Sequence, residues 1–382
     1  MLPRQMRPWL ILVALAILTQ TGCVPTVWLP DSSGFIYVKP IKVAGEPSGQ
    51  LVHYDLKMKK ERVVVEDVGK STNWPALSPD GKRIAIARLV GGPKEAKTLE
   101  MVLYDFQGKQ LHQSKAFAWA PPPMPNAISL NTLMLFWSPK DDMVVVSDAE
   151  QTGIYSVKAD TLKVIEKSSP IIHGGTPIRP DGAGFLCMVG EKDEQRVVFM
   201  DWTRKEQKIE SNAFVAILPK DDAGNNPIAA VFLSPLLTQS WWDGNKAVAG
   251  FKNAKQTYSV DTSKNKIDYT EAFAELVKKQ GETKQSLATR FDFPGDFSVE
   301  VMQTKGEGGK PATSKVTLVN NKTKKAETLI DRGPETATFL PSPDGKLVAI
   351  CMAGPFPGPD QEEWVLVISS KGEVVAKMSF TR

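Results

Sequence analysis

The chain repeats one short turn sequence at widely separated positions, and this repetition limits the available folds more than any other feature. Residues 78–82 and 342–346 both read Ser-Pro-Asp-Gly-Lys, and an apolar, β-prone run follows each copy. Proline presets φ at the first turn position, aspartate hydrogen-bonds its own backbone, and glycine accepts a positive φ, so the chain reverses sharply here. Small repeated sheet units of this kind cannot bury their own faces and must stack on one another.

Weaker versions of the turn lie between and beside the two strong copies. The seven turns carry aspartates for which we expect a structural role: Asp31, Asp80, Asp141, Asp181, Asp243, Asp296 and Asp344. A β-rich run that ends in a polar hairpin tip follows each turn, at residues 51–55, 101–105, 153–157, 197–201, 257–261, 316–320 and 364–368. The two markers alternate strictly, which indicates seven units of about 50 residues.

Seven units of four short strands fit an all-β, seven-bladed β-propeller, in which four-stranded antiparallel blades pack radially around a channel. The first and last units each hold four strands of their own, so the ring is expected to close by face-to-face packing. A short helix is predicted within residues 270–280, capped by Thr270 and with Phe273, Leu276 and Val277 on one face. The blades are predicted at about residues 24–70, 71–118, 119–169, 170–212, 213–270, 271–333 and 334–382.

The N-terminus is typical of a secretion signal, because Arg4 and Arg7 precede an apolar run over residues 9–18. This run is shorter than the roughly 20 apolar residues that span a bilayer. Residues 18–23, Leu-Thr-Gln-Thr-Gly-Cys, resemble the bacterial lipobox. That resemblance implies a signal peptide over residues 1–22, lipid on Cys23, and a periplasmic or outer-membrane lipoprotein of the cell envelope. Two alternatives stay open: cleavage nearby that leaves Cys23 as a free thiol, or an uncleaved anchor.

Cysteine and histidine placement predicts neither a disulfide nor a metal site. Cys187 and Cys351 each lie in the strand after a turn, in well-separated units, so we expect two small buried thiols. His53, His112 and His173 lie at unrelated positions of their units, so a metal cluster is not predicted, and no cofactor is expected.

The remaining chemical motifs are weak. No Gly-x-Ser-x-Gly elbow of a serine hydrolase is present. Residues 69–72 imitate the end of a phosphate-binding loop, but Val64 stands where its first glycine is required. Residues 221–226 carry oxygen ligands without the spacing of a helix-loop-helix calcium site. Trp241 and Trp242 are either blade core or a stacking platform for a sugar or a partner.

The net charge of +4 becomes +2 once Arg4 and Arg7 are removed with the leader, and this near-neutral balance does not favour a nucleic-acid partner. The basic runs at residues 57–62 and 322–325 fall at expected hairpin tips, where lysine is solvated.

The Ser-Pro-Asp-Gly-Lys turn followed by an apolar strand resembles the TolB-type propeller repeat, a WD-repeat-like blade common in bacterial envelope proteins. The resemblance implies the fold; such propellers serve as protein-binding scaffolds, as regulatory parts of peptidases and occasionally as enzymes. We therefore expect a non-enzymatic, lipid-anchored envelope module that binds or scaffolds a protein, a peptide or a cell-wall glycan. The alternative is an enzyme, a lyase or glycan hydrolase, with carboxylates from different blades at the channel mouth.

Overall fold

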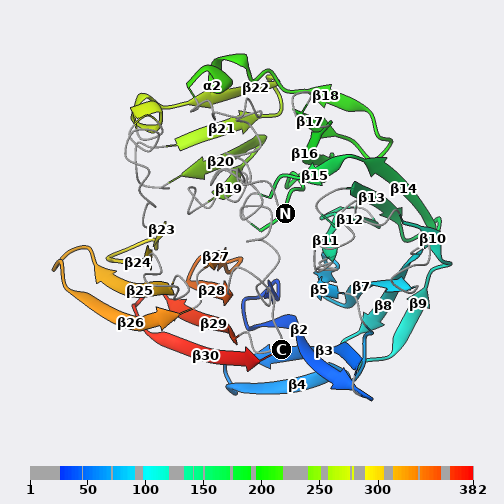
Figure 1. Cartoon of the computed structure of the whole chain (residues 1–382), viewed down its shortest axis with the longest axis horizontal. Helices are drawn as coiled ribbons and strands as arrows, with labels where there is room; N and C mark the ends of the chain where they lie inside the picture. The colour runs from blue at the N-terminus through cyan, green and yellow to red at the C-terminus, as the bar shows by residue number, and fades with distance from the viewer. Residues whose placement is uncertain are drawn as a thin grey trace, which may run out of the picture.

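Seven β-sheets stand in a ring around a common centre (Figure 1). The computed structural model describes residues 26–44, 46–69, 72–90, 98–119, 133–140, 142–148, 151–172, 175–190, 195–217, 240–250, 257–275, 278, 289–304, 313–333, 336–353 and 362–381. Each sheet is one blade, and its strands follow one another outward from the centre, as the repeat predicts.

The first three blades contain the strands β1 (Val27–Trp28), β2 (Gly34–Val43), β3 (Glu46–Asp55) and β4 (Lys60–Val65); β6 (Ala76–Leu77), β7 (Arg83–Val90), β8 (Thr98–Asp105), β9 (Gln110–Gln113) and β10 (Phe117–Ala118); and β11 (Leu133–Trp137), β12 (Met143–Ser147), β13 (Gln151–Ser156) and β14 (Thr161–Glu166). In blade 2 the outermost strand is split, since β9 and β10 both pair with β8.

The last four blades contain β15 (Ser168–Pro170), β16 (Phe185–Val189), β17 (Arg196–Met200) and β18 (Glu206–Lys208); β19 (Ser240–Asp243), β20 (Lys246–Gly250), β21 (Thr257–Asp261) and β22 (Lys266–Tyr269); β23 (Thr289–Asp292), β24 (Phe297–Thr304), β25 (Thr313–Asn320) and β26 (Ala326–Gly333); and β27 (Thr336–Pro341), β28 (Leu347–Ala353), β29 (Glu362–Ser369) and β30 (Val374–Thr381). The predicted seven-bladed propeller is therefore confirmed.

The two sequence markers occupy fixed places in every blade. The turns that carry the repeated aspartates connect the first strand to the second, and the β-rich runs form the third strand. One strand departs from the repeat: β5 (Thr72–Trp74) pairs in parallel with β11, so it extends blade 3 although it precedes blade 2 in the chain.

Apolar clusters between neighbouring blades form the core. In blades 1 and 7, Phe35 and Tyr37 are fully buried with Ala349 and Val365 from the other end of the chain. The Trp28 indole nitrogen also donates a hydrogen bond to the Leu340 carbonyl, at 2.8 Å. Among the described strands, blades 1 and 7 each consist of their own consecutive segments, so the ring closes through packed faces.

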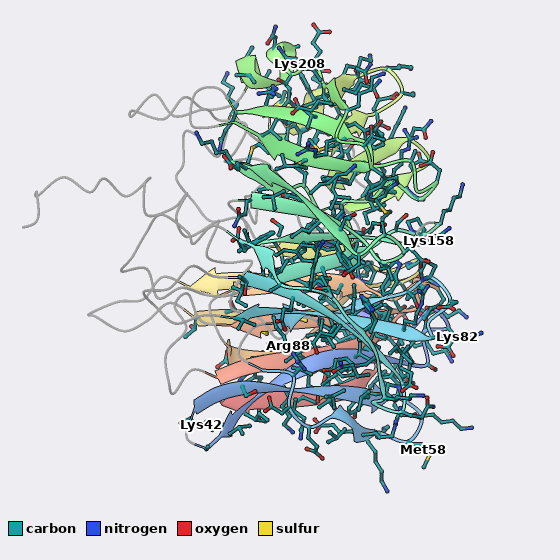
Figure 2. All side chains as sticks on the ribbon, turned by 90° about the vertical axis from the view of Figure 1, so that its right-hand side faces the viewer. Lys42, Met58, Lys82, Arg88, Lys158 and Lys208 are labelled. Carbon is teal, nitrogen blue, oxygen red and sulfur yellow. The ribbon has the colours of Figure 1, made fainter. Side chains whose placement is uncertain are left out.

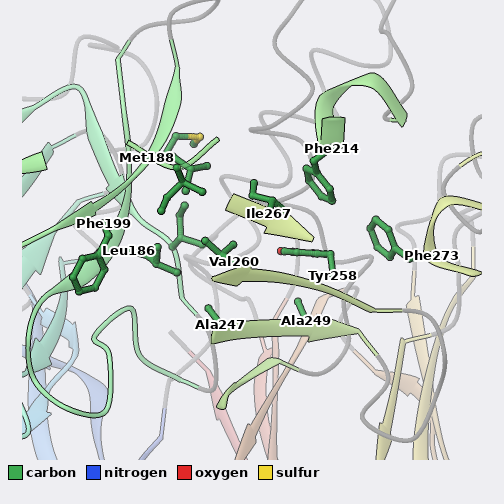
Figure 3. Packing of buried hydrophobic residues seen from close by; sticks show 13 residues of the cluster. Leu186, Met188, Phe199, Phe214, Ala247, Ala249, Tyr258, Val260, Ile267 and Phe273 are labelled. Atoms are coloured by element: carbon green, nitrogen blue, oxygen red, sulfur yellow. The ribbon is translucent and has the colours of Figure 1, made fainter. Parts of the chain in front are cut away.

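Two short helices lie beside blade 5. The predicted helix is present at residues 271–275 and 278, where Thr270 Oγ1 accepts a hydrogen bond from the Phe273 amide at 3.2 Å; Leu276 and Val277 lie outside the described residues. A second helix, α2 (Asn212–Ile217), was not predicted. Its Phe214 is fully buried and stacks on Phe273 with ring centroids 5.9 Å apart (Figure 3).

The connections between first and second strands and between third and fourth strands lie on one side of the ring, which we call the turn face. Met58, Lys82 and Lys158 come from such connections and lie along one edge in Figure 2, whereas Lys42, near the hairpin from β2 to β3, lies toward the opposite edge. Cys23 and the rest of residues 1–25 lie outside the described residues. Within the described part of the chain, no helix combines the length and the apolar character needed to cross a membrane.

Candidate functional site

The turns that build the turn face share one hydrogen-bond geometry at both ends of the chain. In blade 2, Asp80 Oδ1 accepts hydrogen bonds from the Ser78 hydroxyl at 2.5 Å and from the Lys82 amide at 3.1 Å. In blade 7, Asp344 Oδ1 accepts the equivalent bonds from Ser342 at 2.7 Å and Lys346 at 3.1 Å. The Ser78 bond holds the pKa of Asp80 below its usual value. Each aspartate is therefore tied to its own turn as a carboxylate.

The other turn aspartates vary around this geometry. Asp31 accepts bonds from the Ser33 hydroxyl and amide, at 2.7 and 3.0 Å. Asp181 accepts two bonds from the guanidinium of Arg179, at 2.8 and 2.7 Å, and this guanidinium lowers the pKa of Asp181. Exposed Asp243 ends β19, Asp296 lies 3.8 Å from the Lys322 ammonium, and Asp141 lies outside the described residues.

A pocket of about 470 Å³ opens on the turn face at the seam between blades 2 and 3. The first-to-second-strand turns of both blades and the third-to-fourth-strand hairpin of blade 3 form its walls. Its lining residues are Pro79, Asp80, Arg83, Pro139, Lys140, Asp142, Met143, Ser156 and Lys158. Ligand pockets in proteins typically have volumes of roughly 300–1,000 Å³. This seam is therefore large enough to hold a small molecule or a few residues of a peptide.

An ion pair across the seam fixes the pocket walls relative to each other. Arg83 of β7 lies 2.8 Å from Asp142 of blade 3, and its guanidinium carbon sits 4.9 Å from the centre of the Trp137 ring. Trp137 is 8% exposed, so Arg83 stacks on a buried aromatic surface while its Nη2 donates a hydrogen bond to the carboxylate. The Asp142 carbonyl also accepts the Val157 amide at 2.8 Å, which fixes the turn against the hairpin of its own blade.

Two lysines supply the unpaired charge of the pocket. Lys140 and Lys158 are exposed, and neither ammonium forms an ion pair with any carboxylate in the described part of the chain. Lys140 acts at longer range on Asp181 of the next blade, where it adds to the lowering of that pKa. The pocket therefore offers two ammonium groups beside an apolar surface made by two prolines and a methionine.

His53 and His112 do not line this pocket. His53 in β3 packs edge-on against Phe106 with ring centroids 5.9 Å apart, and burial lowers its pKa. His112 in β9 lies 3.1 Å from the Tyr155 hydroxyl, which donates to Asp160 at 2.9 Å. His173 lies outside the described residues, and the side chains that are described contain no group of three or more His, Cys, Asp or Glu placed to hold a metal ion.

The remaining candidates take part in packing. The half-buried Trp242 donates from its indole nitrogen to the Thr176 carbonyl at 3.2 Å and packs against the core between blades 4 and 5. Cys187 lies in blade 4 and Cys351 in blade 7; both are buried and neither forms a disulfide, as predicted. Burial raises the pKa of the Cys187 thiol to about 12.

Sequence reasoning did not single out the pocket residues. Lys140 and Asp142 belong to the third turn and Arg83 follows the second, but Arg83 and Asp142 are 59 residues apart in the chain. The sequence does carry one signal for this contact: an arginine follows one turn directly, and an acidic residue ends the next turn. Opposite charges at these positions could have predicted an ion pair between the two blades.

Comparisons with known proteins give propellers as structural neighbours. No family model matches the chain, and no curated protein sequence matches it. A crystal structure of TolB from Acinetobacter baumannii matches with a TM-score of 0.38 and 14% identity, over 90% of this chain and 79% of that one. The β-propeller domain of the Trilobed protease from Pyrococcus furiosus matches with a TM-score of 0.39 and 11% identity, over 91% and 89% of the two chains. A prolyl endopeptidase structure matches with a TM-score of 0.47 and 12% identity, over 99% of this chain and 53% of that one. At TM-scores below 0.5, no function follows from these likenesses.

Proposed function

We propose that the protein is a non-enzymatic binding module of the cell envelope, tethered by lipid on Cys23, which presents its turn face to a protein partner. The observation that carries this proposal is the charged pocket of about 470 Å³ at the seam of blades 2 and 3. The Arg83–Asp142 ion pair joins the two blades that form its walls. Walls that are in place before a ligand enters lower the entropy cost of binding.

The enzymatic alternative is less well supported by the same pocket. Hydrolysis of a glycan needs two carboxylates about 5 to 10 Å apart, one to act as an acid and the other as a base or nucleophile. Among the described lining residues, both carboxylates already have partners, because Asp80 accepts a hydrogen bond from Ser78 and Asp142 is paired with Arg83. The arrangement suits recognition better than proton transfer.

The tether can be tested through the lipid itself. Cells that express the full chain are labelled with radioactive palmitate, and the wild type is compared with Cys23→Ser. We expect label and membrane association in the wild type, loss of both in Cys23→Ser, and retention of both in the matched control Cys187→Ser. Equal labelling of the Cys23→Ser variant would refute lipidation at this position.

The binding role can be tested by photo-cross-linking in the envelope. A p-benzoylphenylalanine placed at Ser156 lines the pocket, whereas the same group placed at Lys371 lies on the turn face at blade 7. We expect a discrete adduct from position 156 that position 371 does not give. Failure of both positions to give an adduct above an unirradiated control would count against a binding function of this face.

A further inference from the structure

We propose that the pocket at the seam of blades 2 and 3 binds an acidic peptide segment of a protein partner. This inference rests on the proposed function and specifies the chemistry of its ligand. Carboxylates of the segment pair with Lys140 and Lys158, and an apolar side chain between them packs on Pro79, Pro139 and Met143.

The distribution of charge in the pocket carries the argument. Among the described residues, three cationic and two anionic side chains line it, but they are not equally available. Arg83 and Asp142 satisfy each other at 2.8 Å, and Asp80 is held at its turn by the Ser78 hydroxyl and the Lys82 amide. The ammonium groups of Lys140 and Lys158 have no carboxylate within ion-pair distance among the residues that the structure describes, and the aliphatic part of Lys140 lies beside Gly182 of blade 4.

The type of cation favours carboxylates over phosphates. A guanidinium recognises phosphate best through a bidentate fork, and the one arginine among the described lining residues already donates from Nη2 to Asp142 and stacks its face on Trp137. A lysine ammonium is a compact, hydrated point charge with three donors, which one carboxylate oxygen can meet. Two such groups in one pocket with Pro79, Pro139 and Met143 suit a peptide that carries both acidic and apolar side chains.

The carboxylates of Asp80 and Asp142 also disfavour binding of a densely charged anionic polymer in the pocket. Asp80 and Asp142 lie in the same pocket, so a nucleic acid or polyphosphate would bring closely spaced negative charges against them. A peptide spreads its charges over a longer backbone and can place a neutral residue opposite each aspartate. Because the lysines are exposed, the attraction is screened by salt over about 8 Å at physiological ionic strength.

The experiment uses the purified full chain and two fluorescein-labelled twelve-residue peptides, one with glutamate at every third position among leucine and alanine, the other with glutamine in place of glutamate. Fluorescence anisotropy gives the affinity of each peptide. The pocket variant is Lys140→Glu with Lys158→Glu. The matched control is Lys325→Glu with Lys371→Glu, which makes the same change of net charge at exposed hairpin tips of blades 6 and 7.

We expect the wild type to bind the glutamate peptide roughly tenfold more tightly than the glutamine peptide, and the pocket variant to lose this preference while the control keeps it. The proposal is overturned if both variants bind equally, if the glutamine peptide binds as well, or if a single-stranded oligonucleotide of equal charge displaces the peptide at the same concentration. A cross-linked partner at position 156 that the pocket variant also captures would overturn the acidic-peptide assignment and leave the binding function standing. Peptide binding that depends on the two lysines, without any adduct in the envelope, would support the acidic-peptide assignment and count against the binding function in the envelope.

Discussion

Replacement of Gly108 by alanine tests the packing of blade 1 against blade 2. Gly108 lies in the hairpin after β8 with a φ of 81°, and a Cβ at this position would approach the Val64 carbonyl oxygen of β4 well under 3.0 Å. Real Cβ atoms do not make such contacts with backbone, so the hairpin has to move away from blade 1. The neighbouring interblade hydrogen bond from Arg62 to the Phe106 carbonyl, at 2.8 Å, moves with it.

The cost of Gly108→Ala follows from three contributions. Alanine at a positive φ costs about 1 kcal/mol. Loss of the exposed hydrogen bond from Arg62 costs about 1 kcal/mol. Exposure of about 40 Å² of apolar surface around Val64 and Phe106, as the two blades separate, costs about 1 kcal/mol more. We therefore expect the free energy of unfolding to fall by about 3 kcal/mol.

The matched control is Gly345→Ala in the blade 7 turn. Gly345 has a similar φ of 70°, but no atom lies within 4 Å of the added Cβ, so only the backbone strain of about 1 kcal/mol applies. Urea unfolding followed by tryptophan fluorescence measures both variants. Equal losses at the two glycines would show that the hairpin of blade 2 does not press on blade 1 as described, and the packing argument would fail.

Three further predictions use other parts of the ring. Phe35→Ala removes a fully buried ring from the interface between blades 1 and 7 and should lower the free energy of unfolding by about 3–5 kcal/mol in the same urea assay; a loss below about 1 kcal/mol would contradict closure through this interface. Cys187, with its pKa raised to about 12 by burial, should not react with a water-soluble thiol reagent at about pH 8 until the protein is unfolded, and reaction in the native state would place it at the surface. Acid should destabilise the turns. Side-chain hydrogen bonds from Ser33, Ser78 and Arg179 lower the pKa values of Asp31, Asp80 and Asp181, respectively, below the usual 3.8. The contribution of these carboxylates to the free energy of unfolding is therefore complete above about pH 4 and is lost as the pH falls through the lowered pKa values. Thermal unfolding between about pH 6 and pH 2 should show this loss, and Asp181→Asn should show a smaller one; identical profiles would refute the assignment for Asp181.

The blade pattern could be predicted because its determinants are local. The Ser-Pro-Asp-Gly-Lys turns close hydrogen bonds between residues two positions apart, as between Asp80 and Lys82, and the same chemistry recurs at Asp344. A repeat of such turns sets the strand order before any long-range contact is known.

Elements that depend on long-range contacts could not be predicted from the sequence. Helix α2 has six residues, and Phe214 is buried against Tyr258 and Phe273, which lie more than 40 positions further along the chain. A helix this short is not stable by propensity alone, so nothing within its own sequence marks it strongly. Strand β5 likewise depends on β11, whose partner residues Leu133 and Met134 follow some 60 positions later. The pocket belongs to the same class, since stacking of two blades joins Arg83 to Asp142.

Side-chain length separates the charges of the turns. Aspartate is short, and the oxygens of Asp80 and Asp344 are held at the backbone of their turns; the longer side chains of Lys82 and Lys158 form no ion pair among the described residues and project from the turn face (Figure 2). A ligand that approaches the pocket therefore meets the exposed lysines beside the exposed carboxylates of Asp80 and Asp142. Since the whole chain carries a net charge of only +4, these charges act within a few ångströms and give little long-range steering. Binding at the pocket should consequently change most in its dissociation rate when Lys140 or Lys158 is replaced, because the contacts that distinguish ligands form only after the encounter.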